Sequence, residues 1–186
     1  VISTVFIYPH DKEFLGMVRY VDSLAQMLFP IMVFGGAQAL IHFYPALSEH
    51  NKSQLFKYGI VTILGFSLTI LALLLLVRSF IDWENYKYVF YAFPLGFSLV
   101  FVELFRRQAT NIEKLEIPTL YEKIIPKVSL PIIFLFIIGE HLSNMTALMA
   151  FIGSYFMMLL LIATYVFKHY KLHGDYSFSS LFAEVP

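Results

Sequence analysis

The sequence contains no cysteine and few charged residues. Only 14% of its 186 residues are Asp, Glu, Lys or Arg, whereas 59% are hydrophobic and the mean hydropathy is +0.72. Soluble domains contain about 25% charged residues. Without cysteine the chain can form no disulfide framework, thiolate metal site or cysteine nucleophile. The composition therefore excludes a secreted or cytosolic globular enzyme and predicts an all-α integral membrane protein.

The chain also lacks an excess of either charge and any catalytic motif. Thirteen basic residues balance 13 acidic residues, so there is no basic field to attract nucleic acid, and we expect no such partner. Glu140-His141 lacks the second histidine of a zinc metalloprotease helix. A Gly-rich phosphate loop and a Gly-x-Ser-x-Gly elbow are absent too. We therefore expect no enzymatic activity, cofactor or metal.

Long apolar runs take the place of charge. A helix of about 20 apolar residues crosses a bilayer, and residues 58–77 and 145–167 contain no charged residue at all. Val1–Tyr8 is too short to cross alone, and we interpret it as the end of a helix that begins earlier. The predicted spans are 1–8 (partial), 14–44, 55–80, 86–108, 117–139 and 142–169.

Basic residues are distributed unevenly between the two sets of loops. Loops on the cytoplasmic side of a membrane carry the excess of Lys and Arg. The loops after the second, fourth and sixth predicted helices hold eight, and the opposite loops hold three. The eight are Lys52, Lys57, Arg106, Arg107, Lys114, Lys123, Lys168 and Lys171, and the three are Lys12, Arg78 and Lys87. We expect the first set to be cytoplasmic. Most Tyr and Trp residues near span ends fit an aromatic belt, whereas Tyr155 lies closer to mid-span.

Prolines and a glycine pair interrupt the predicted helices. Pro30, Pro94, Pro126 and Pro131 each remove a backbone donor, which predicts kinks in a bundle that lines a cavity. Transmembrane helices also tolerate proline without any such role. Gly35-Gly36 would allow a close contact between helices.

Ionisable side chains within the predicted spans are the candidate functional residues. Each costs roughly 2.5–3.5 kcal/mol at the centre of the bilayer, so it is expected to face a partner or a water-filled cavity. Arg19, Asp22 and Gln26 share one helical face. Arg19 paired with Asp22 could hold phosphate in such a cavity. The other interpretation is a local ion pair near the lipid headgroups.

Three further positions carry polar groups near span ends. His42, one turn after Gln38, could contact a phosphate or sense protonation, or could be an ordinary hydrogen-bonded residue. Lys127 lies one turn deeper than Lys123, and either lysine could extend to the interface. Glu103 and Arg107, four residues apart, predict an interfacial ion pair.

The order and spacing of these features resemble a known transporter family. Phe14–Arg19, Gly35-Gly36 and His42–Pro45 resemble the first complete helix of the polysaccharide biosynthesis flippases, which belong to the multidrug/oligosaccharidyl-lipid/polysaccharide exporter superfamily. Glu103–Arg107 followed by Ile117–Lys123 is similar to that family's fourth and fifth helices and the loop between them. The resemblance extends over essentially the whole chain, but no single motif is highly specific.

This resemblance implies a transporter of 12–14 helices in two lobes around a central cavity, located in the bacterial inner membrane. Residues 1–171 would be the N-terminal lobe of six helices, with the first helix truncated, and residues 172–186 would connect it to the C-terminal lobe. The implied partners are membrane lipids, that second lobe and an undecaprenyl-diphosphate-linked oligosaccharide, moved by alternating access.

The resemblance also bears on the candidate site. The predicted contacts of the anionic headgroup are Arg19, Asp22, Gln26, His42 and Lys127. The family pattern has a basic residue, often Arg, where this chain has His42, which makes Arg19 and Lys127 the stronger candidates. Two alternatives stay open at this stage: a cation-coupled drug or solute antiporter that uses Asp22, and a membrane scaffold that transports nothing.

Overall fold

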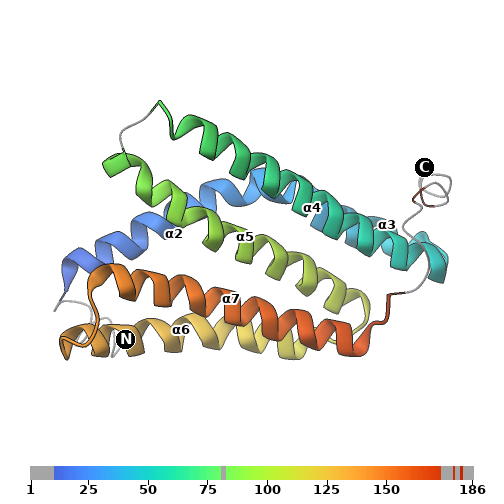
Figure 1. Ribbon diagram of the computed structural model, residues 1–186. Helices are drawn as coiled ribbons and strands as arrows, with labels where there is room; N and C mark the ends of the chain where they lie inside the picture. Colours follow the sequence, from blue (N-terminus) through green and yellow to red (C-terminus); the bar gives the residue numbers. More distant parts are fainter. Residues whose placement is uncertain (1–10, 81–82, 173–177, 179–180, 182–186) are drawn as a thin grey trace.

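The computed structural model describes residues 11–80, 83–172, 178 and 181, and the regular elements among them are all helical, as predicted (Figure 1). They are α2 (Lys12–Val33), α3 (Gly36–Phe43), the short 3-10 helix η2 (Tyr44–Ala46), α4 (Glu49–Val77), α5 (Trp83–Asn111), α6 (Glu116–Ile138) and α7 (Asn144–His169). The predicted partial span 1–8 lies outside the described residues, as does most of the predicted connector 172–186.

Side-chain caps determine where two of the helices begin. Asp11 precedes α2, and its carboxylate accepts a hydrogen bond of 2.8 Å from the backbone N–H of Phe14. Ser143 precedes α7, and its hydroxyl accepts one of 3.3 Å from the N–H of Thr146. Both caps satisfy donors that have no partner within the helix.

The predicted span 14–44 is two helices rather than one. Residues 12–33 and 36–46 meet at an angle of 51°. Pro30 lies in the last turn of α2, and the chain then passes through the left-handed region at Phe34 (φ 39°) and Gly35 (φ 73°). Gly35 is suited to this conformation because it has no Cβ. At Gly36, an added Cβ would lie 3.7 Å from Ile63, an ordinary van der Waals contact, so α3 packs on α4 there without requiring a glycine.

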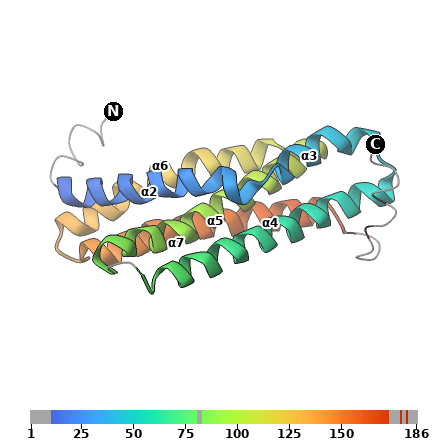
Figure 2. The ribbon, with the colours of Figure 1, turned by 90° about the horizontal axis from the view of Figure 1, so that it is seen from above.

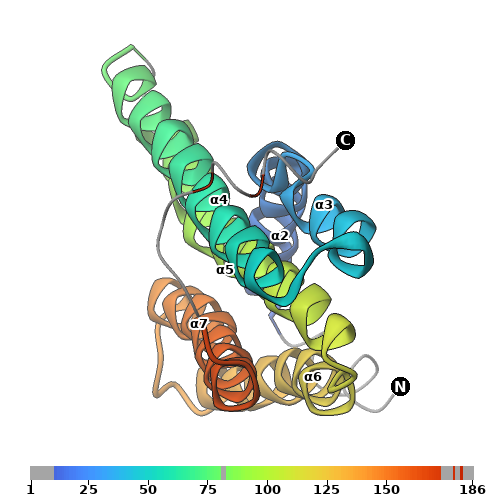
Figure 3. The same cartoon turned by 90° about the vertical axis from the view of Figure 1, so that its right-hand side faces the viewer.

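α5 is the central helix of the bundle and packs against α2, α3, α4, α6 and α7. The helices run back and forth, which brings the loops after α3, α5 and α7 to one end of the molecule (Figure 1). Figure 2 shows the same antiparallel arrangement from above. In the end view of Figure 3, α6 and α7 form a pair on one side of α5, while α2 and α3 lie on the other. Of the eight basic residues predicted to be in cytoplasmic loops, Lys114 and Lys171 lie in these loops, and the other six lie in the parts of α4, α5, α6 and α7 that adjoin them.

Two hydrophobic cores lie along this arrangement. One, near the start of α2, joins Phe14, Val21 and Ala25 to α5, to Phe134 of α6 and to Leu148 of α7. The other lies nearer the opposite end and joins α3, α4, α5 and α7. α6 contributes little to either, because only three of its 23 residues are buried.

Within the part of the chain that the structure describes, three helices are long and apolar enough to cross a membrane: α4, residues 86–111 of α5, and α7. The bent pair of α2 and α3 would be a fourth span. The predicted fifth span is present as α6, but any long window within it includes Glu122, Lys123 and Lys127, so it does not meet the same criterion of apolarity. Most of the apolar stretch of α4 is exposed, with 11% of it buried. Such a surface indicates a membrane protein.

The approach of α2 to α5 gives a test of this packing. A Cβ added at Gly96 of α5 would lie 3.4 Å from the backbone oxygen of Ala25, whereas one added at Gly65 of α4 would meet nothing within 4 Å. Gly96→Val should therefore destabilise the protein by about 1–3 kcal/mol through overpacking, beyond the effect of Gly65→Val. Thermal unfolding in detergent measures both variants. Equal melting temperatures would contradict this packing of α2 on α5.

Candidate functional site

A cavity of about 320 Å³ lies between α2 and α6 and brings together three of the predicted site residues. α2 contributes Arg19 and Asp22, and α6 contributes Lys127. The remaining lining residues are Leu15, Val18, Pro126, Leu130, Phe151 and Tyr155. We call this space the charged cavity. Its ionisable residues come from helices more than 100 positions apart in the sequence.

The antiparallel register of α2 and α6 explains why these residues meet. The rings of Phe14 and Phe134 are in edge-to-face contact, with centroids 5.0 Å apart, and both residues are fully buried. At a rise of about 1.5 Å per residue, Asp22 lies about 12 Å from Phe14 along α2, and Lys127 lies about 10 Å from Phe134 along α6. The two residues therefore reach the same depth.

The electrostatics differ from the expectation in one respect. Asp22 is half-buried and is hydrogen-bonded by the side-chain amide of Gln26, one turn further along α2. Among the described residues no ion pair joins Arg19 to Asp22, so the predicted pairing is wrong. Gln26 takes the place of Arg19 as the partner. Arg19 and Lys127 both line the cavity and are exposed. Two cations beside one carboxylate could hold a bound anion such as a phosphate group.

Gln26 itself lines a second, smaller cavity of about 170 Å³ with Phe29, Leu99, Val102, Glu103 and Glu122. The ion pair predicted between Glu103 and Arg107 is confirmed at this smaller cavity, because Nε of Arg107 lies 2.6 Å from Oε1 of Glu103. Nε of Arg106 also donates to Glu103, at 3.0 Å, and Nη1 of Arg106 lies 3.6 Å from Oε2 of Glu122. The pair is thus part of a network that connects α5 to α6.

His42 lies away from both cavities. It is on α3, beyond the 51° bend, where its side chain is exposed and its ring meets that of Phe43 edge to face at 4.9 Å. Four of the five predicted site residues therefore line either the charged cavity or the smaller cavity among α2, α5 and α6, and His42 lines neither. Lys123 is exposed and lines neither of them.

Two aromatic residues of α7 were missed as site residues. Phe151 and Tyr155 border the charged cavity, and their rings lie edge to face at 5.1 Å. Tyr155 could have been singled out from the sequence, since a tyrosine near mid-span is not explained by an interfacial aromatic belt. Phe151 could not, because one more phenylalanine in an apolar helix is uninformative.

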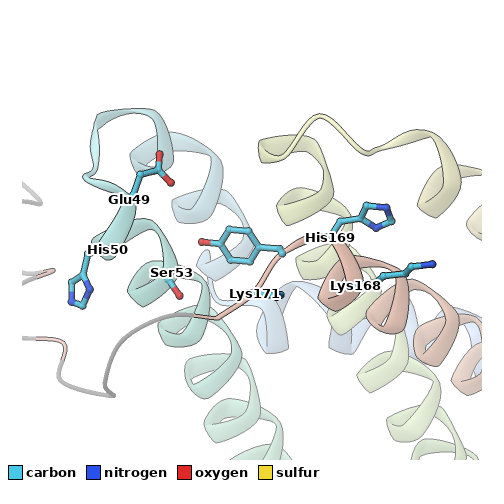
Figure 4. A pocket seen from close by; sticks show the side chains of 7 residues that line it. Glu49, His50, Ser53, Lys168, His169 and Lys171 are labelled. Carbon is cyan, nitrogen blue, oxygen red and sulfur yellow. The ribbon is translucent and has the colours of Figure 1, made fainter.

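A larger cavity of about 650 Å³ separates the start of α4 from the end of α7 (Figure 4). Its lining residues are Glu49, His50, Ser53, Lys168, His169, Tyr170 and Lys171. Burial raises the pKa of Tyr170, which keeps its hydroxyl protonated. The side chains of Lys168 and His169 point away from Glu49 and Ser53 (Figure 4). Since these groups do not converge, the charged cavity is the better candidate site.

No family model, curated protein or solved structure matches the chain. The resemblance to the flippase family therefore stays a prediction. The structure itself defines a class: an all-helical protein with helices apolar enough to span a membrane and a charged cavity between two of its helices.

The two sides of α6 allow a test of whether this cavity is wet. Lys127 faces the charged cavity, while its neighbour Val128 lines an apolar cavity between α6 and α7. The 186 residues contain no cysteine. Each of the variants Lys127→Cys and Val128→Cys would therefore have a single thiol among them. In membranes, a water-soluble methanethiosulfonate should modify Lys127→Cys at least about tenfold faster, since an apolar site suppresses the reactive thiolate. Equal rates would contradict a water-filled cavity.

Proposed function

We propose that the chain is the N-terminal lobe of a bacterial inner-membrane flippase that moves an undecaprenyl-diphosphate-linked oligosaccharide during polysaccharide biosynthesis. The observation that carries this proposal is the convergence of Arg19, Asp22 and Lys127 on one cavity from α2 and α6. Ionisable groups at membrane depth are costly and are typical of substrate pathways. A second lobe would complete the path by rocking against this one.

The chemistry of a lipid-linked diphosphate fits these surroundings. Its headgroup cannot cross hydrocarbon without polar partners, and Arg19 and Lys127 offer a cation on each side of the cavity. Its long chain needs an apolar surface at the same level. The exposed residues of α4, α6 and α7 supply one, including Leu68, Val128 and Leu160.

The proposal predicts that the two cations are needed for transport. In the full-length protein in its host, Arg19→Gln or Lys127→Gln should lower the export of surface glycan about 10- to 100-fold, the effect of losing one charge-assisted hydrogen bond. Lipid-linked repeats should accumulate on the cytoplasmic side. Surface glycan staining and lipid extraction measure the two quantities.

Lys123→Gln is the matched control, because Lys123 is an exposed lysine one turn away that does not line the cavity. It should leave export unchanged. Wild-type export in both Arg19→Gln and Lys127→Gln would overturn the proposal. The same would follow if Lys123→Gln reduced export as strongly as Lys127→Gln.

One observation favours a second candidate, a cation-coupled antiporter. Asp22 is a half-buried carboxylate at the charged cavity, which is the kind of group that couples transport to a proton or another cation. In that case Asp22→Asn should abolish coupled efflux of small solutes and leave surface glycan intact. Loss of surface glycan in Asp22→Asn would instead support the flippase.

A further inference from the structure

α6 is held to the bundle mainly along one side. It packs along α7, and of its 23 residues only Pro118, Ile133 and Phe134 are buried. α7, by comparison, has nine buried residues among 26. Ile133 and Phe134 belong to the core near the start of α2, at one end of the charged cavity. At the other end of α6, Pro118 is buried, and Tyr121 and Ile125 are partly buried against the second core.

An ion pair adds a polar attachment at this second end. Glu122 lies one turn before Pro126 on α6, and its carboxylate meets Arg106 of α5 at 3.6 Å. Arg106 is oriented in turn by Glu103, which it shares with Arg107. Among the ion pairs of the described residues, Arg106–Glu122 is the one that joins α6 to another helix. Both side chains are about one-third exposed (32% and 37%), so the pair can separate without leaving a buried charge unpaired.

The Phe14–Phe134 contact and the Arg106–Glu122 ion pair lie beyond opposite ends of the charged cavity. The buried Phe14–Phe134 contact closes one end, and Glu122, with Gln26 opposite, lines the small cavity at the other end. Lys127 lies between them on α6, facing Arg19 and Asp22 on α2. A shift of the Glu122 end of α6 relative to α5 would therefore change the distance of Lys127 from α2.

We infer that the Arg106–Glu122 ion pair positions Lys127 across the charged cavity from Arg19. Glu122 and Arg106 are thus positioning residues that act on the anion site through α6. Phe134 anchors one end of α6, and the end that carries Glu122 can move relative to it. The functional meaning of this positioning rests on the proposed transport, but the positioning itself can be measured without it.

The experiment measures the proximity of α2 and α6 in the full chain in membranes. Arg19→Cys and Lys127→Cys are introduced together and joined by a flexible bifunctional thiol reagent. Adding Glu122→Gln should lower the cross-linking yield about two- to fivefold, the change that a partly exposed ion pair supports. Arg106→Gln should have the same effect from the α5 side, and Glu122→Asp should restore most of the yield.

Glu116→Gln is the matched control, since it removes the same charge from an exposed position in the first turn of α6. Equal yields in Glu122→Gln and Glu116→Gln would overturn the positioning role. Glycan export is measured in parallel, with Arg19 and Lys127 unchanged. In Glu122→Gln, a lower cross-linking yield with normal export would support the positioning and contradict the proposed function. A normal cross-linking yield with lost export would contradict the positioning and support the proposed function.

Discussion

The organisation of this protein depends on the high free energy of a charged side chain in hydrocarbon. Each such group at the centre of a bilayer costs roughly 2.5–3.5 kcal/mol on insertion scales, and α2 and α6 place Arg19, Asp22 and Lys127 along their lengths. The cost falls when the groups share a polar space, which is how the bundle arranges them. The uncharged stretches of α4 and α7, residues 58–77 and 145–167, can instead present broad apolar surfaces outward.

Because the charged groups must share a polar space, it matters how the other helices pack around the central helix α5. α5 packs against every other α-helix described, and its Gly96 lets the backbone of α2 come close at Ala25. α2 packs along α5 and α6 packs along α7, and the two charged helices meet at the Phe14–Phe134 contact and border the charged cavity. A bundle in which α2 and α6 interlocked along their whole length would have no room for the cavity.

The coarse features of the fold could be predicted from hydropathy and loop charge, because both are local properties of the sequence. Predicted span ends agree with the helices to within a few residues for α5 and α6. The bend after Pro30 was harder to place, since it arises from left-handed backbone at Phe34 and Gly35 rather than from proline alone. The common face of Arg19, Asp22 and Gln26 follows from helical periodicity. That Lys127 would join them, and that Tyr155 would border the same cavity, depends on how α2, α6 and α7 pack, which no local pattern encodes.

The mixed character of α6 follows from the same physics. Pro126 and Pro131 cannot donate to the backbone carbonyls of Glu122 and Lys127, four residues earlier in each case. At membrane depth a carbonyl without a helical partner needs water or a protein donor, and both of these residues line cavities. With α6 at membrane depth, as the proposed function has it, its prolines and its charged residues would need the same polar surroundings. A helix of this kind is poorly suited to a dry core, which accounts for its shallow packing. It lies along α7, is buried at Phe134 near one end and at Pro118 near the other, and is joined to α5 by an ion pair.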